Sequence, residues 1–234
     1  MVHPNCPKAL PVKVRSGGYY DLEIKTIFFG GIIGNCYLVE TDTGFILIDT
    51  ARASKRTKLE RELESAGCTP GNLKLIILTH GDFDHTGNCA YLHEKFGVKI
   101  AMHYYDSGMV EHGDMFWNRK TGNILIRIIV NFLFRISKFK PDLTIDERYD
   151  LSEYGLDAKV LYLPGHSKGS IGILTADGDL FCGDLLANTN KPDIGSIIDD
   201  KAAANASIEK LKRLGINTVY PGHGNPFPMS SFTK

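Results

Sequence analysis

Residues 73–85, LKLIILTHGDFDH, join a run of apolar residues to a cluster of polar ones. The first part, LKLIIL, is apolar at nearly consecutive positions, which is typical of a strand buried on both faces of a sheet. The segment THGDFDH (79–85) follows directly and holds four histidine or aspartate side chains. If the strand continued through it, the neighbours Asp84 and His85 would face apart. We therefore expect the chain to curl here, so that these side chains face a common region.

Three further segments carry similar side chains where predicted strands end. They are LPGHSKGS (163–170), FCGDLL (181–186) and YPGHG (220–224). Loops at strand ends are held by a rigid sheet yet are free to present side chains, and binding residues concentrate there. Any one of these short motifs is more often an ordinary turn than a site, but four of them in this order favour a metal site. Histidine and carboxylate together suit zinc, iron or manganese.

The pattern around these motifs predicts strands and helices in two successive sets. Strands are expected at 20–29, 36–40, 45–50, 73–80, 98–103, 158–166, 170–179, 179–186 and 216–224, the last of which runs into a loop. Helices are expected at 54–67, about 87–96 and 201–215. Ser54 is the expected N-cap of the first helix, and Gly67 lies where that helix should stop. Strands followed by helices, twice over, predict two sheets packed face to face with helices outside, four layers in all.

Residues 104 to about 150 interrupt this rhythm, and we expect them to form a helical insertion. Within it, NILIRIIVNFLFRISKF (123–139) places Arg127, Asn131 and Arg135 four positions apart among apolar residues. As a helix, this segment has one narrow polar stripe and more apolar surface than a helix normally leaves in water. Three interpretations stay open: a core helix, an apolar lid over the metals, and the interface of a homodimer through residues 123–139.

Length and composition fit one globular domain or two small ones, and we expect a single domain spanning residues 1–234. Lysine plus arginine equals aspartate plus glutamate, at 27 each, so we expect no nucleic-acid partner recruited by overall charge. The five cysteines are odd in number and scattered, which favours a reducing compartment. Prolines interrupt the N-terminal MVHPNCPKALPVKVR, and no stretch reaches the roughly 18 consecutive apolar residues of a membrane span. We expect a cytoplasmic protein without an integral membrane segment.

The sequence resembles the metallo-β-lactamase superfamily over about residues 20–227. The family's HxHxDH signature stands here as HGDFDH (80–85), and its later ligands as His166 in PGHS, Asp184 in GD and His223 in PGHG. The resemblance implies an α/β fold of the αβ/βα type, a four-layer sandwich with the metals at one edge between the sheets.

The resemblance also implies a dinuclear centre and a role for each ligand. The ligands of the first ion would be His80, Asp82 and His166. Those of the second ion would be Asp84, His85 and His223, with Asp184 as the bridge. Asp84 and Asp184 are the expected catalytic residues, with Asp184 relaying a proton to the leaving group. We expect two divalent ions, zinc in the first place and iron or manganese as alternatives.

One position departs from the family's commonest pattern, because Asp82 stands where most members have the second histidine. The flavodiiron branch is similar in placing a carboxylate there, although a glutamate, and that branch binds iron. We expect Asp82 to be an altered ligand that favours a harder ion. The alternative is that it only accepts a hydrogen bond from a neighbouring ligand and orients it.

These residues predict a hydrolase that acts on a small-molecule substrate. Two ions can share a water, lower its pKa and polarise the substrate, so that metal-bound hydroxide is the nucleophile. A small ester, thioester, lactone or phosphodiester is the expected substrate. Two alternatives belong to other classes of protein. One is a di-iron or mono-iron redox enzyme resembling flavodiiron proteins or persulfide dioxygenases, which Asp82 motivates. The other is a non-catalytic metal-binding protein, which would lack some ligands.

Overall fold

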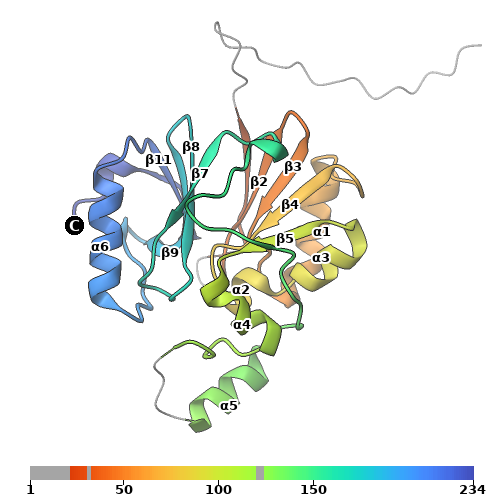
Figure 1. Ribbon diagram of the computed structural model, residues 1–234, viewed down its shortest axis with the longest axis horizontal. Coiled ribbons are helices and arrows are strands. Elements are labelled where there is room, and N and C mark those ends of the chain that lie inside the picture. Colours follow the sequence, from red (N-terminus) through yellow and green to blue (C-terminus); the bar gives the residue numbers. More distant parts are fainter. Residues whose placement is uncertain (1–21, 31–32, 120–123) are drawn as a thin grey trace, which may run out of the picture.

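Two six-stranded sheets lie face to face at the centre of the molecule, as the computed structural model shows (Figure 1). The structure describes residues 22–30, 33–119 and 124–234. Helix α6 covers the outer side of one sheet, and helices α1 and α3 cover the outer side of the other. The four-layer sandwich expected from the sequence is therefore confirmed.

The first sheet has the strand order β1-β2-β3-β4-β5-β6. Its strands are β1 (Glu23–Ile27), β2 (Cys36–Thr41), β3 (Gly44–Ile48), β4 (Leu73–Ile77), β5 (Lys99–Met102) and β6 (Leu143–Thr144). Strands β1 to β3 are antiparallel neighbours, whereas β3 to β6 pair in parallel. The carboxyl ends of β3, β4 and β5 therefore meet at one edge, where THGDFDH leaves β4.

The second sheet has the order β12-β11-β9-β8-β7, with β10 paired to β9. Its strands are β7 (Ala158–Tyr162), β8 (Ile171–Thr175), β9 (Asp179–Asn188), β10 (Asp193–Ile194), β11 (Thr218–Gly224) and β12 (Phe227–Pro228). Strands β9 and β11 run parallel, and their register shifts twice between Tyr220 and His223. These irregularities lie beside the GD and PGHG motifs.

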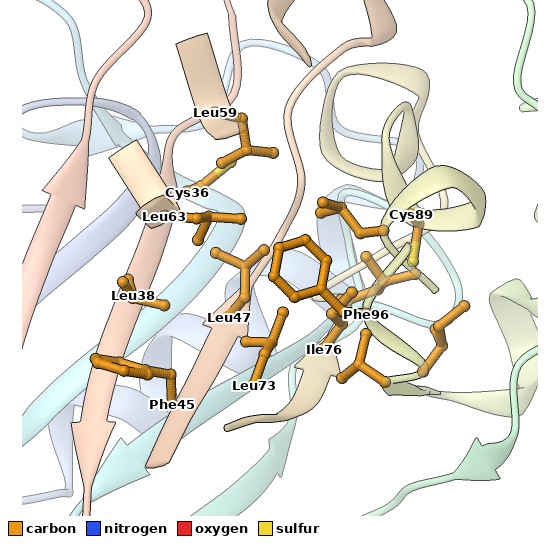
Figure 2. Close-up of a cluster of buried hydrophobic side chains, with 14 of the residues drawn as sticks. Cys36, Leu38, Phe45, Leu47, Leu59, Leu63, Leu73, Ile76, Cys89 and Phe96 are labelled. Atoms are coloured by element: carbon orange, nitrogen blue, oxygen red, sulfur yellow. The ribbon is translucent and has the colours of Figure 1, made fainter. Parts of the chain in front are cut away.

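Apolar side chains fill the space between the layers. Between the sheets, Ile46, Ile48 and Leu75 of the first sheet belong to the same buried cluster as Ile173 and Phe181 of the second. Outside the first sheet, side chains of α1 (Arg56–Ser65) and α3 (Cys89–Phe96) pack on the strands, as Figure 2 shows. Burying each leucine or isoleucine contributes about 1.5–3 kcal/mol, so this packing fixes the sheets.

The remaining helices are short and lie at the margins of the sandwich, except for α6 (Lys201–Lys212), which packs on the second sheet. They are α2 (Phe83–Thr86), α4 (Tyr104–His112) and α5 (Ile124–Leu133), and the 3-10 turns η1 (Ala53–Lys55), η2 (Ser152–Tyr154) and η3 (Met229–Ser231). The segment expected to be a helical insertion thus holds α4 and α5, followed by the short strand β6. None of the helices among the described residues has the length and apolarity needed to cross a bilayer.

Two local expectations were wrong. Ser54 does not cap a helix, because it lies within η1, and the N-cap of α1 is Lys55 without a side-chain cap bond. His223, expected in the loop that follows its strand, lies within β11, whereas Asp184 lies within β9, inside the strand expected over 179–186. Gly183, with φ 52°, and the shifted β9–β11 register let these strands deform without ending. A ligand position can therefore arise from an irregularity inside a strand.

The core-helix interpretation of the insertion is also wrong, because α5 has no buried residue. Phe132 is 74% exposed and Ile128 is 58% exposed. The polar stripe faces the protein instead, since Arg127 and Asn131 both donate hydrogen bonds to Asp114. The lid and homodimer interpretations stay predictions.

Candidate metal centre

The seven expected ligand residues gather at the edge where the two sheets meet. Three overlapping groups each place one nitrogen or oxygen atom per residue within 4.8 Å of the others. The groups are His80, Asp82 and His166; His80, His85 and Asp184; and Asp84, His85 and His223. The first sheet supplies four of these residues through the segment after β4, and the second sheet supplies the other three.

The chain curls after β4, as the sequence predicts. Asp82 is the N-cap of the four-residue helix α2, and its carbonyl accepts hydrogen bonds from the backbone N–H groups of His85 and Thr86, both at 3.0 Å. His80 and Asp82 precede this helix, whereas Asp84 and His85 lie on it. The turn therefore brings the two pairs into different ligand groups instead of onto opposite faces of a strand.

Asp184 stands among the three groups. Its Oδ1 lies 3.2 Å from His85 Nε2, and its Oδ2 lies 3.1 Å from His223 Nε2 and 3.9 Å from His166 Nε2. A Cβ at position 222 would collide with Asp184 Oδ1, so Gly222 is required for this close approach. One carboxylate is thus within reach of histidines from both sides of the cluster.

The lone pairs of the cluster fit a divalent cation. His85 Nδ1 donates to the Asp49 carboxylate at 2.8 Å, and His166 Nδ1 donates to the Ile197 carbonyl at 2.6 Å. Their Nε2 lone pairs therefore face the cluster. Among the described residues, no hydrogen-bond partner is found for the buried atoms His80 Nε2, His85 Nε2 and Asp184 Oδ1, although the last two lie 3.2 Å apart. Buried polar atoms normally have partners, so these atoms suit coordination of an ion.

Charge within the cluster shifts the pKa of each group. Burial would raise the pKa of Asp184, but His85 and His223 hold it well below its ordinary value. Burial would lower the pKa of His85, but Asp184 and Asp49 raise it. For Asp84, burial itself raises the pKa, and the nearby Asp184 adds to this effect. The carboxylates of the cluster thus stabilise positive charge beside them, either on a bound ion or on a protonated histidine such as His85.

Asp49 is a functional residue that the sequence interpretation missed. It directly follows β3 and has a left-handed backbone, with φ 60°. Its carboxylate accepts hydrogen bonds from the Thr79 N–H and hydroxyl, each at 2.8 Å, in addition to His85 Nδ1. An aspartate at the end of a strand parallel to β4 was the available signal. Asp49 fixes the tautomer and orientation of His85.

Asp106 was also missed, and it joins the first two ligand segments. Its buried carboxylate accepts hydrogen bonds from Gly81 N–H at 3.1 Å, Gly169 N–H at 2.7 Å and the Ser167 hydroxyl at 2.6 Å. Gly81 belongs to the segment after β4, and the other two follow His166. Asp106 therefore holds these segments at a fixed separation.

Arg119 enters the cluster from the insertion, and no sequence signal placed it there. Its Nη1 lies 2.8 Å from Asp82 Oδ1, and its Nη2 lies 3.0 Å from Asp82 Oδ2 and 3.2 Å from His166 Nε2. The side chain is only 4% exposed. Burial would raise the pKa of Asp82, but the Arg119 guanidinium holds it well below the ordinary value. An internal cation thus contacts two of the three expected ligands of the first ion.

Comparisons with known proteins agree with this geometry. A family model described as the metallo-beta-lactamase superfamily matches residues 29–223. A probable metallo-hydrolase of Bacillus subtilis is 24% identical over 249 residues, which covers 94% of this chain and 91% of the relative. A hydroxyacylglutathione hydrolase of Haemophilus influenzae is 27% identical over 160 residues, which covers 65% of this chain and 66% of that protein.

Solved structures show the same fold. A protein crystallised in a di-iron-bound form superimposes with a TM-score of 0.69 and 28% identity, covering 88% of this chain and 95% of that one. A subclass B3 metallo-beta-lactamase of Bradyrhizobium japonicum gives a TM-score of 0.66 with 21% identity, covering 86% of this chain and 74% of that one. Since the family match spans most of the sequence and the fold agrees, this chain belongs to the metallo-β-lactamase superfamily.

Proposed function

We propose that this chain is a metal-dependent hydrolase that cleaves a small ester, thioester, lactone or phosphodiester. The observation that carries the proposal is the set of buried, unpartnered lone pairs on His80, His85 and Asp184 at the meeting edge of the sheets. Superfamily membership and relatives named as metallo-hydrolases support it. A degenerate, non-catalytic protein would lack ligands, and this chain has a competent side chain at each expected position.

We assign each ligand as the resemblance to the superfamily implies. The first ion would be held by His80, Asp82 and His166. The second ion would be held by Asp84, His85 and His223, with Asp184 between the two. Bound divalent ions would lower the pKa of water and polarise a carbonyl or phosphoryl oxygen. The three groups of histidine and aspartate side chains support ion binding. The identity and the number of the ions are part of this proposal.

The protein's own groups would orient the ligands and move protons. Asp49 holds His85 in one tautomer, and Asp106 holds the segments around His80 and His166 together. Asp184 is the group proposed to pass a proton to the leaving group. Asp84, whose pKa is raised by burial, is the second acid–base candidate in the cluster.

Among the four bond types, the thioester has the most support from the comparisons. A relative in Haemophilus influenzae is named a hydroxyacylglutathione hydrolase, and hydroxyacylglutathione is a thioester. We propose an acyl thioester as the first substrate class to test, with esters, lactones and phosphodiesters after it.

A second candidate function is iron-dependent redox chemistry. Asp82 adds an oxygen donor where histidine is commoner, and oxygen donors favour iron or manganese relative to zinc. The similar structure solved in a di-iron-bound form agrees with this alternative. In that case the protein would reduce oxygen with electrons from a separate donor, or use oxygen to oxidise a persulfide, instead of hydrolysing an ester.

Metal analysis of anaerobically purified protein, followed by a substrate panel and an oxygen-uptake assay, separates the two functions. We expect close to two ions per chain and hydrolysis that Asp184→Asn abolishes. Asp179→Asn is the matched control, because Asp179 lies on the same strand away from the cluster. Iron-dependent oxygen uptake without hydrolysis would favour the redox function. Loaded protein that never exceeds one ion per chain would contradict the dinuclear assignment.

We also propose that residues 1–234 form one domain with a helical insertion at about 104–150. A cytoplasmic location, the absence of nucleic-acid partners and a homodimer through residues 123–139 stay predictions.

A further inference from the structure

Helix α5 presents an apolar face outward. The side chains exposed by half or more include Ile124, Ile128, Ile129, Phe132 and Leu133. In Figure 1 the helix lies below α4, apart from the two sheets. A contiguous apolar face of this kind is uncommon on a soluble domain and marks an interaction surface. We call these five residues the α5 apolar face.

The orientation of this face is built into the structure. Arg127 Nε donates to Asp114 Oδ2 at 2.7 Å, and Asn131 Nδ2 donates to Asp114 Oδ1 at 2.6 Å. The Asp114 carboxylate also accepts from the Phe116 N–H at 3.0 Å. These bonds hold the polar stripe of α5 against the protein, so its apolar residues must point away from it.

Exposed positive charge follows the face in the sequence. The sequence from Met115 to Pro141 contains six lysine or arginine residues and no aspartate or glutamate, but Arg119 pairs with Asp82 and Arg127 pairs with Asp114. Arg135, Lys138 and Lys140 follow α5 directly and are exposed. The whole chain has a formal net charge of zero, so this positive charge is local. An apolar helix face followed by exposed basic side chains resembles the helices that lie in the interface of an anionic membrane.

We propose that the α5 apolar face docks this chain onto an anionic lipid surface, with Arg135, Lys138 and Lys140 against the lipid headgroups. A ten-residue helix is about 15 Å long, and its apolar side chains would enter the boundary between headgroups and acyl chains. A second copy of the chain fits less well. A two-fold contact uses the same patch on both copies, so it would crowd the basic side chains of both into one small interface.

The same segment reaches the metal centre from its two ends. Arg119, which precedes α5, contacts Asp82. Phe134, which follows α5, stacks on Phe83 with ring centroids 4.4 Å apart. Phe83 lies between the ligand candidates Asp82 and Asp84. A docked α5 would therefore place the metal centre close to the lipid surface. The docking itself does not depend on the proposed hydrolase activity.

Vesicle sedimentation with the whole chain tests the proposal. Phosphatidylcholine vesicles in which roughly one third of the lipid is phosphatidylglycerol should pull down the protein, and neutral vesicles should bind it at least about tenfold less. Trp117, the only tryptophan, lies within the insertion and is 49% exposed, so its emission should shift to shorter wavelength on binding. High salt should weaken binding.

Paired variants identify the surface. Ile128→Ser with Phe132→Ser should lower the vesicle affinity roughly tenfold or more, whereas Phe28→Ser, an exposed phenylalanine elsewhere, should not. Arg135→Glu with Lys138→Glu should have a similar effect, and Lys159→Glu with Arg213→Glu is the control of equal charge change. Melting curves confirm that each variant is folded.

Two results would overturn the proposal. The first is a parent protein that stays in the supernatant with anionic vesicles, or apolar-face variants that bind as well as the parent. The second is a dimer in solution that Ile128→Ser with Phe132→Ser converts to a monomer, without vesicle binding by either form. That result would assign the α5 apolar face to a second copy of the chain.

Discussion

Three buried aspartates around the cluster perform different tasks because their partners differ. Asp49 binds the proton-bearing nitrogen of His85, and Asp106 accepts only from groups outside the ligand set. Asp82 Oδ2 lies 3.1 Å from His166 Nε2, and the same carboxylate pairs with Arg119. Asp49 and Asp106 thus position ligands. Asp82 is instead paired with Arg119, which would compete with the ion that Asp82 is expected to bind.

Asp49→Asn is expected to weaken metal binding by about 10- to 100-fold. Asparagine tolerates the left-handed backbone that Asp49 adopts at φ 60°, so the substitution removes the charge behind His85 without straining the chain. Competition with a chelator measures the affinity. Asp49→Ala, which also loses the acceptor, should weaken binding further. Equal affinity in Asp49→Asn and the parent would show that this charge does not act on His85.

Arg119→Met is expected to have opposite effects on the metal-free and the metal-bound protein. Without Arg119, the buried Asp82 carboxylate loses its arginine partner. The free energy of unfolding of the metal-free protein should therefore fall by about 3 kcal/mol. The affinity for the first ion should rise roughly tenfold or more, because a cation no longer opposes it.

Denaturant unfolding with a chelator present and metal titration measure these two effects. Arg148→Met is the control, since Arg148 also pairs with an aspartate but is 90% exposed. A lower metal affinity in Arg119→Met would instead mean that Arg119 supports the loaded site.

At the scale of helices and strands, the sequence predicted most element positions but not which face of each element meets protein. Strand β4 was predicted because its two faces are both apolar, which is how it lies in the sheet. Helix α5 has an equally clear helical period of polar residues. That period alone cannot show that Asp114 lies next to the polar stripe and accepts its hydrogen bonds. The curl at α2 was predictable because neighbouring ligands cannot share one face of a strand. Arg119 was not, because its position depends on how the insertion folds back.

Asp114→Asn is expected to loosen α5. Burial would raise the pKa of Asp114, but hydrogen bonds from Arg127 and Asn131 lower it from its ordinary value of 3.8. The hydrogen bonds from Arg127 and Asn131 to Asp114 anchor α5, and we call them the α5 anchor. The charged carboxylate stabilises this anchor at pH values above 3.8, and the stabilisation is lost as the pH falls through the lowered pKa of Asp114. The anchor should hold at about pH 5 and release in stronger acid.

Hydrogen exchange of the α5 amides, corrected for intrinsic rates, measures the anchor. Asp114→Asn should exchange faster than the parent at about pH 5, and the difference should shrink in stronger acid. Asp150→Asn removes a carboxylate that does not contact α5 and should leave exchange unchanged. Equal protection of α5 in both variants would show that other contacts hold the helix.

At the scale of the molecule, the cluster lies where two separately built halves meet. Because β3, β4 and β5 are parallel, their carboxyl ends come to one edge, and the second sheet brings β9 and β11 to the same edge with shifted register. The four motifs in order predicted a metal site, and the resemblance to the superfamily implied its place at the edge between the sheets. The sequence did not show that the PGHG motif would stay inside a strand.

An ion bound to residues from both sheets would cross-link the halves, so metal removal should destabilise the whole fold. An ion present at about 100 times its dissociation constant adds about 2.7 kcal/mol, which raises the melting temperature of a chain of this size by about 5–10 °C. Calorimetry with added zinc and with a chelator measures the difference. His85→Ala and His223→Ala should each lose most of the gain, although one lies on α2 and the other on β11. His93→Ala, outside the cluster, should keep it. If His223→Ala, His166→Ala and Asp184→Asn all kept the full gain, the second half would not hold an ion, and the cross-link would not exist.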